Sequence, residues 1–146
     1  MQPIIHLNWF AIAAAMAAAV VIGFLWYGPL LGKAWMTEIG IPADHKPDPK
    51  IMRRGMILMV IGAFLTVTVL AHSIEVWRPS SWNLSPDQPH ATYGFFGAFF
   101  PWLGFYVPLL FNSVAWENRS WKLFGINAGY HLVALLAAAM ILAFWR

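Results

Sequence analysis

The stretch LNWFAIAAAMAAAVVIGFLWY, residues 7–27, decides the class of this protein because it runs for 21 residues without a charged side chain. About 20 helical residues are enough to cross a hydrocarbon core of about 30 Å. Three further apolar stretches follow, over residues 54–76, 91–114 and 123–145. Strands are excluded, since four strands cannot close a barrel and backbone groups in lipid must be paired. We therefore expect an all-α integral membrane four-helix bundle.

The composition supports the same class. The chain has 146 residues, of which 60% are hydrophobic and only 10% are charged, whereas about 25% are charged in soluble domains. The absence of cysteine excludes disulfides, thiolate metal sites and a cysteine nucleophile. No basic residue precedes the first span, which is also too long for a signal peptide, so we expect it to be retained. The sequence predicts a single transmembrane domain over residues 1–146, multi-pass in the inner (cytoplasmic) membrane.

Basic residues predict the orientation of the spans. Seven lie in or beside the first and third loops, and two lie on the opposite side. The seven are Lys33, Lys46, Lys50, Arg53, Arg54, Arg119 and Lys122, and the two are Arg78 and Arg146. Lysine and arginine accumulate in cytoplasmic loops, so both termini are expected on the outer side. Since membrane topology accounts for these charges, we expect lipids and no nucleic acid as partners.

Helix breakers and aromatic residues refine this layout. An amphipathic interfacial segment is expected over residues 30–39, after the Gly28-Pro29 break. Pro101 and Pro108 predict a kinked third span. Eight of the nine tryptophans lie at or near predicted span ends, which is typical of an aromatic belt, and only Trp102 falls mid-span.

Two short sequences resemble each other, YGPLL at residues 27–31 and YVPLL at residues 106–110. Each ends a span that runs from outside to inside, which suggests two parallel helical hairpins related by a pseudo-two-fold axis. Chance similarity in an aromatic, apolar chain is the alternative.

Small residues mark faces where helices approach closely. Ala11, Ala15, Ala19 and Gly23 form a ridge at i+4 spacing, and a GxxxG opens the fourth span. These faces can pack within one chain or between chains. The second arrangement predicts a homo-oligomer or a subunit of a membrane complex.

Polar residues inside spans are the default functional candidates, because burying them in a membrane is costly. Asn127 and His131 lie four apart on one face, with Tyr130 beside them; Asn112 and Glu117 lie toward the same inner side. A neutral histidine near the midplane can accept a proton, ligate a metal or bind a carbonyl. The simpler interpretation is hydrogen bonding across helices that sets their register.

A second polar set lies on the outer side. Three histidines and a carboxylate are candidate ligands for a divalent metal, namely His6, His72, Glu75 and His90. Their spacing is not diagnostic. Glu75 with Arg78 is also an ordinary i,i+3 pair at a helix end.

Two longer motifs resemble a known family. WYGPLLGKAW, residues 26–35, and ENRSWKLFGINAGYHL, residues 117–132, are similar to signatures of the uncharacterised bacterial membrane proteins known as domain of unknown function 1761. The resemblance covers nearly the whole chain and implies about four spans, with no assigned activity, substrate or cofactor. Its motif positions add Trp26, Tyr27 and Lys33 to the inner candidate site.

Three functions follow, in this order. The first is an accessory or structural membrane subunit or homo-oligomer. The second is a small oligomeric transporter or channel for a proton, ion or small solute that uses His131 and Asn127. The third is an intramembrane protein that binds lipid, pigment or metal. No phosphate loop, GxGxxG or GxSxG motif is present, so an enzyme is not favoured, and no cofactor is predicted.

Overall fold

The computed structural model describes residues 2–42 and 44–146, and every regular element in these residues is helical. The elements are α1 (Trp9–Leu25), a π-helical turn (Trp26–Leu30), α2 (Gly32–Ile39), α3 (Pro49–Val76), a 3₁₀ turn (Pro79–Trp82), α4 (His90–Pro101), a second π-helical turn (Trp102–Tyr106), α5 (Val107–Ala115) and α6 (Trp121–Phe144). Four stretches are long and apolar enough to cross a membrane, Trp9–Leu30, Pro49–Val76, His90–Ala115 and Trp121–Phe144. The all-α, four-helix prediction is confirmed.

Local capping signals set where the helices begin and end. Asn8 accepts hydrogen bonds from two amides of the first turn of α1, and Ser120 accepts one from Leu123 of α6. The helix over the second span begins at Pro49, five residues before the hydrophobic stretch, because Asp48 caps it and proline suits the first helical position. The expected amphipathic segment forms α2, which ends at Gly40 in the left-handed conformation (φ 79°).

The first and third spans are distorted near a proline, as predicted. Pro29 lies in the first π-helical turn, where Gly28 leaves helical geometry (φ −104°, ψ −106°), and Pro101 directly precedes the second turn. Trp26 and Trp102 open these two turns, and each indole N–H donates to a carbonyl of α6, on Ile126 (3.0 Å) and Ala128 (2.8 Å) respectively. Trp26 therefore links the first span to α6, and the aromatic belt stays a prediction.

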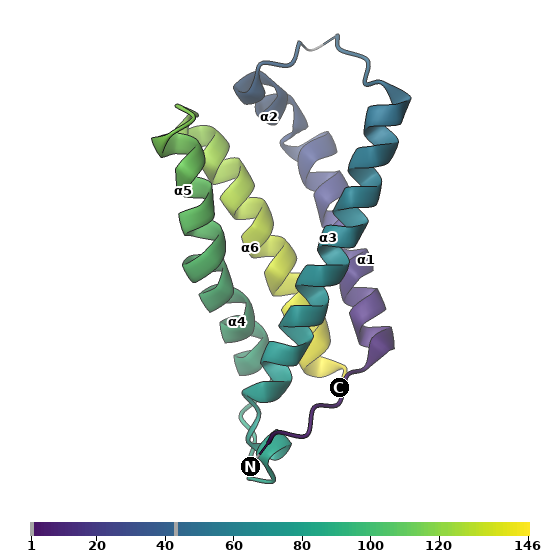
Figure 1. Cartoon of the computed structure of the whole chain (residues 1–146), viewed down its shortest axis with the longest axis vertical. Helices are drawn as coiled ribbons and strands as arrows, with labels where there is room; N and C mark the ends of the chain where they lie inside the picture. Colours follow the sequence, from purple (N-terminus) through teal and green to yellow (C-terminus); the bar gives the residue numbers. More distant parts are fainter. Residues whose placement is uncertain (1, 43) are drawn as a thin grey trace.

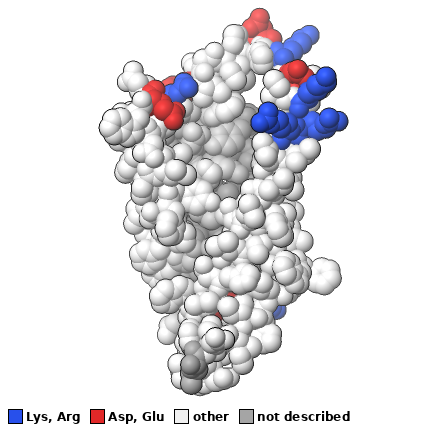
Figure 2. Space-filling model, viewed as in Figure 1, with Lys and Arg blue, Asp and Glu red and all other residues white. Residues whose placement is uncertain are grey.

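Helix α6 lies at the centre of the bundle and makes its most extensive contacts with α1 and α4 (Figure 1). Helix α3 packs mainly on α1, and it diverges from α5 toward the end of the molecule that carries α2 (Figure 1). Both termini lie at the opposite end (Figure 1). Figure 2 shows charged side chains gathered at the α2 end, the one predicted to face the cytoplasm; the side of the membrane itself stays a prediction.

The small-residue faces pack within the chain. Ala11, Ala15, Ala19 and Gly23 are all buried on α1, opposite a buried run of alanines on α6. In the GxxxG of α6, a Cβ added at Gly129 would lie 3.1 Å from Trp26 Cζ2, whereas one at Gly125 would meet nothing within 4 Å. The ridge of α1 therefore packs inside one protomer, whereas Gly125 of the GxxxG stays exposed.

Candidate functional site

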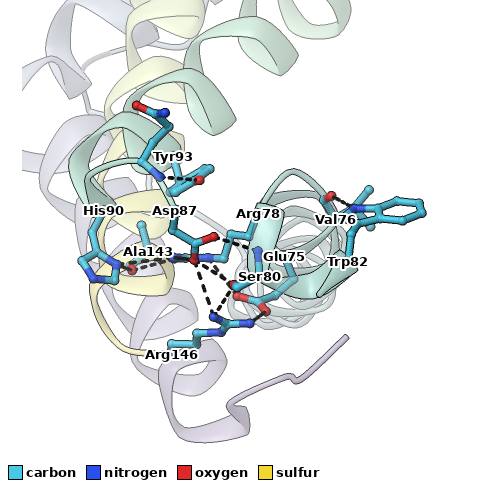
Figure 3. A network of polar contacts seen from close by, with 11 residues as sticks. Glu75, Val76, Arg78, Ser80, Trp82, Asp87, His90, Tyr93, Ala143 and Arg146 are labelled. Atoms are coloured by element: carbon cyan, nitrogen blue, oxygen red, sulfur yellow. Dashed lines mark hydrogen bonds and ion pairs between the residues drawn. The ribbon is translucent and has the colours of Figure 1, made fainter. Parts of the chain in front are cut away.

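The end of the bundle that carries both termini, called the outer end here after its predicted side, is closed by a buried ion-pair network (Figure 3). The side chain of Arg78 is fully buried, and its Nε lies 3.1 Å from the Oε1 of Glu75, which is 5% exposed. Arg78 Nη2 donates to the Ala143 carbonyl (2.8 Å), and the guanidinium stacks 4.7 Å from the Tyr93 ring centre. Arg78 thereby joins the end of α3 to the end of α6.

Arg146 adds a second guanidinium to this network. Its Nη2 lies 3.1 Å from Glu75 Oε2, and its Nη1 donates to Ser80 Oγ (2.8 Å). Burial tends to raise the pKa of Asp87, but two hydrogen bonds from Ser80 and the charges of Arg78 and Arg146 outweigh it and lower that pKa. The outer loop is thus held as an ordered cover.

Three of the four proposed metal ligands are occupied by other contacts, and the fourth, His6, is exposed. His72 Nδ1 bonds to the Thr68 carbonyl of its own helix, and Glu75 faces two guanidiniums. His90 Nδ1 lies 2.8 Å from the Ala143 carbonyl and 3.4 Å from Arg78 Nη1. The shorter contact requires the proton on Nδ1, so only that contact is a hydrogen bond. Across residues 2–42 and 44–146, no three His, Asp or Glu side chains are grouped to hold a metal. The i,i+3 ion pair of Glu75 with Arg78, the alternative interpretation, is present.

Five residues of the inner candidate site lie together. The Tyr27 hydroxyl donates to Asn127 Oδ1 (2.9 Å), and the Tyr27 ring packs edge-on against Tyr130, with 5.1 Å between centroids. Tyr130 in turn adjoins His131 (4.9 Å between centroids), and Trp26 packs beneath Gly129. A row of polar side chains therefore runs from the α2 end of the bundle to its middle.

The other three predicted residues do not join this row. Lys33, Asn112 and Glu117 are exposed, and none makes a side-chain hydrogen bond or ion pair within the described part of the chain. Instead α2 reaches α6 through Glu38, which accepts a hydrogen bond from Ser120 and lies 3.1 Å from Lys122 Nζ. The Ser120 hydrogen bond and the Lys122 ammonium lower the pKa of Glu38.

Two residues that the sequence did not single out complete the inner row. Tyr106 stacks on His131 with 4.5 Å between ring centroids, and its hydroxyl lies 3.4 Å from Thr66 Oγ1. Tyr106 ends the second π-helical turn, and Thr66 lies mid-way along α3. A tyrosine and a threonine in an apolar span carry no spacing signal that relates them to His131, so only the packing of α3, α5 and α6 brings them there.

Thr66, Tyr106, Tyr130 and His131 line a central cavity of about 280 Å³ between α1, α3 and α6. The cavity shares Thr66 and Tyr106 with a second hollow of about 350 Å³, which shares Ser73 and Pro101 with a third of about 710 Å³. The second and third hollows, here called the α3–α4 groove, therefore lie in a row beside the cavity, along α3 and α4. No Lys, Arg, Asp or Glu is among its lining residues.

Four long apolar helices around a small polar centre define a multi-pass helical membrane protein. The chain belongs to the family described as protein of unknown function (DUF1761), whose family model matches residues 10–143. No curated protein and no solved structure matches the chain.

Proposed function

We propose that this protein binds a small amphipathic molecule that enters from the lipid phase. The observation that carries the proposal is His131, which lines the central cavity and forms no hydrogen bond with any residue that the structure describes. Polar groups within a membrane-spanning bundle are costly to leave without partners. A bound molecule with a polar end would satisfy the imidazole.

The shape of the site supports the same proposal. Ligand sites are concave and mostly apolar, with a few convergent polar groups. Here the imidazole and the hydroxyls of Tyr106, Tyr130 and Thr66 converge on one cavity, and the α3–α4 groove continues from it with apolar walls. A polar head at His131 and an apolar tail along the groove would match these surfaces.

The alternatives have less support from the geometry. An assembly role was motivated by small-residue ridges, and the ridge on α1 is buried inside the protomer. Passage across the membrane would require the outer ion-pair network around Arg78 to open. A homo-oligomer or a partner subunit stays a prediction. The experiment below also tests it, because it measures the mass of the intact assembly.

Native mass spectrometry of the protein released gently from its own membrane tests the proposal. We expect a stoichiometric small mass on the wild type and its loss in Ala134→Phe, because Ala134 lines the central cavity. Val133→Phe is the matched control, since Val133 is the neighbouring residue of α6 but is exposed outside the bundle. A wild type without any bound small molecule, or equal retention in both variants, would contradict the proposal.

A further inference from the structure

We infer that the bound molecule carries a neutral, hydrogen-bonding head group on an apolar tail. This inference rests on the proposed function and names its ligand class. It is carried by two properties of the cavity and groove, namely the absence of charged lining residues and the hydrogen-bonding groups that line the cavity.

The lining excludes a charged head. The lining residues of the central cavity and the α3–α4 groove include no Lys, Arg, Asp or Glu, and their ionisable side chains are His131 and three tyrosines. The nearest guanidinium on the groove side, that of Arg78, is already paired with Glu75 and stacked on Tyr93. A carboxylate or phosphate placed at His131 would be an uncompensated charge within the membrane, which is strongly unfavourable.

The polar groups of the cavity favour an acceptor. Three hydroxyls and a neutral imidazole each carry one hydrogen to donate. Only Thr66 and Tyr106 lie near each other, at 3.4 Å, which is long for a hydroxyl–hydroxyl bond. Tyr130 and His131 have no hydrogen-bond acceptor among the described residues. A carbonyl or hydroxyl oxygen has two lone pairs, so a neutral head group of either kind can accept from Tyr106 and from His131 at once.

The groove offers apolar walls for a tail. It follows α3 from Thr66 to Trp77, a rise of about 16 Å at 1.5 Å per residue, or roughly half of the hydrocarbon core. Its walls include the rings of Phe96, Phe100 and Phe105.

Binding of probes that share a decyl tail and differ in the head tests the inference. The protein is placed in lipid nanodiscs and incubated with radiolabelled decylubiquinone, a neutral carbonyl-bearing ring, and empty nanodiscs give the background from partitioning. Decanol, decanoate and decane then compete with it. We expect unlabelled decylubiquinone and decanol to compete. Decane, which has no hydrogen-bonding group, and decanoate, which is charged, should compete at least about fivefold more weakly, the typical effect of one missing hydrogen bond.

Conservative variants locate the head. Tyr106→Phe and His131→Phe should each weaken decylubiquinone binding by about fivefold or more, because each removes one donor and keeps a ring. Tyr27→Phe is the matched control, since it also removes a tyrosine hydroxyl from the inner row but does not line the cavity. Unfolding of each variant in SDS is measured in parallel, and a variant that does not fold is replaced by the other of the pair.

The outcomes separate the two proposals. If no decyl probe binds above empty nanodiscs, the proposed function fails. If decane or decanoate displaces the label as well as decylubiquinone does, or if Tyr106→Phe and His131→Phe bind like wild type, the protein does not select a neutral hydrogen-bonding head and the inferred head group is wrong.

Discussion

Replacing Glu75 with alanine should destabilise the fold more than any other single loss of a charge. Glu75 faces two guanidiniums, Arg78 Nε at 3.1 Å and Arg146 Nη2 at 3.1 Å. Arg78 is fully buried at the junction of α3 and α6, so its charge cannot reach water when the carboxylate is removed. The variant therefore leaves a buried cation without its main partner.

The expected cost follows from the remaining contacts. Breaking a buried ion pair by removing one partner costs about 3–5 kcal/mol. The lower end applies here, because Asp87 Oδ2 still lies 3.9 Å from Arg78 Nη1 and the Ala143 carbonyl still accepts from Nη2. The Arg78 Nε and Glu75 Oε2 atoms also lack well-angled hydrogen bonds, so attraction between charges dominates the pair. We expect a loss of about 3 kcal/mol in the free energy of unfolding, roughly a 150-fold change in the equilibrium constant.

Reversible unfolding of the detergent-solubilised protein by SDS, followed by circular dichroism, measures this loss. Glu38→Ala is the control, since it removes a glutamate from an equally short ion pair whose lysine is exposed, and it should cost much less. The double variant Glu75→Leu with Arg78→Met should recover most of the stability, because it removes both charges. A Glu75→Ala variant as stable as Glu38→Ala, or a double variant no better than the single one, would refute this account of the outer end.

Three further predictions test the packing, the carboxylates and the orientation. Gly94→Ala should lose about 1–3 kcal/mol in the free energy of unfolding in SDS, because its Cβ would lie 2.6 Å from Met140 Sδ and 3.2 Å from Met140 Cα. Gly125→Ala, whose Cβ would meet nothing within 4 Å, should lose almost nothing. Equal losses in the two variants would contradict the α4–α6 contact. Because the pKa values of Asp87 and Glu38 are lower in the folded protein than in the unfolded chain, their contribution to stability is complete above about pH 4 and is lost as the pH falls through the folded values; the pH dependence of unfolding should be shallower in Asp87→Asn, and an unchanged profile would argue against its ion pairs. The cysteine-free chain allows Thr37→Cys and Ser85→Cys to be labelled singly in intact cells with a membrane-impermeant maleimide; Ser85→Cys should react and Thr37→Cys should not, whereas the reverse pattern would invert the predicted orientation.

The helices and many of their ends could be predicted because their signals are local. An uncharged run such as residues 7–27 has one stable form in lipid, since only a helix pairs its own backbone groups. Asp48 before Pro49 and Gly40 after Ile39 are cap signals that act within a turn or two. Asp48 begins α3 before its apolar run, which hydropathy alone does not detect.

The inner site could be predicted only in part, for a reason of distance along the chain. Asn127, Tyr130 and His131 share one helix, so their common neighbourhood follows from the helical period. Three other contacts join residues of different helices and therefore depend on how the helices pack. They are Tyr27 with Asn127, Tyr106 with His131, and Glu38 with Ser120. Lys33, from the same family-like motif as Tyr27, is left exposed because α2 turns Glu38 toward α6.

Hydropathy, loop charge and capping thus specify four spans, their order and an expected orientation, because each acts through the chain's immediate surroundings. The rotation and tilt of each helix depend instead on how whole faces fit, such as the alanine ridge of α1 against α6 or Gly94 against Met140. Those fits place α6 at the centre, bury Arg78 at the outer end and separate α3 from α4 enough to leave a groove. The cavity at His131 exists only as a gap among four elements, so no residue of the sequence encodes it locally.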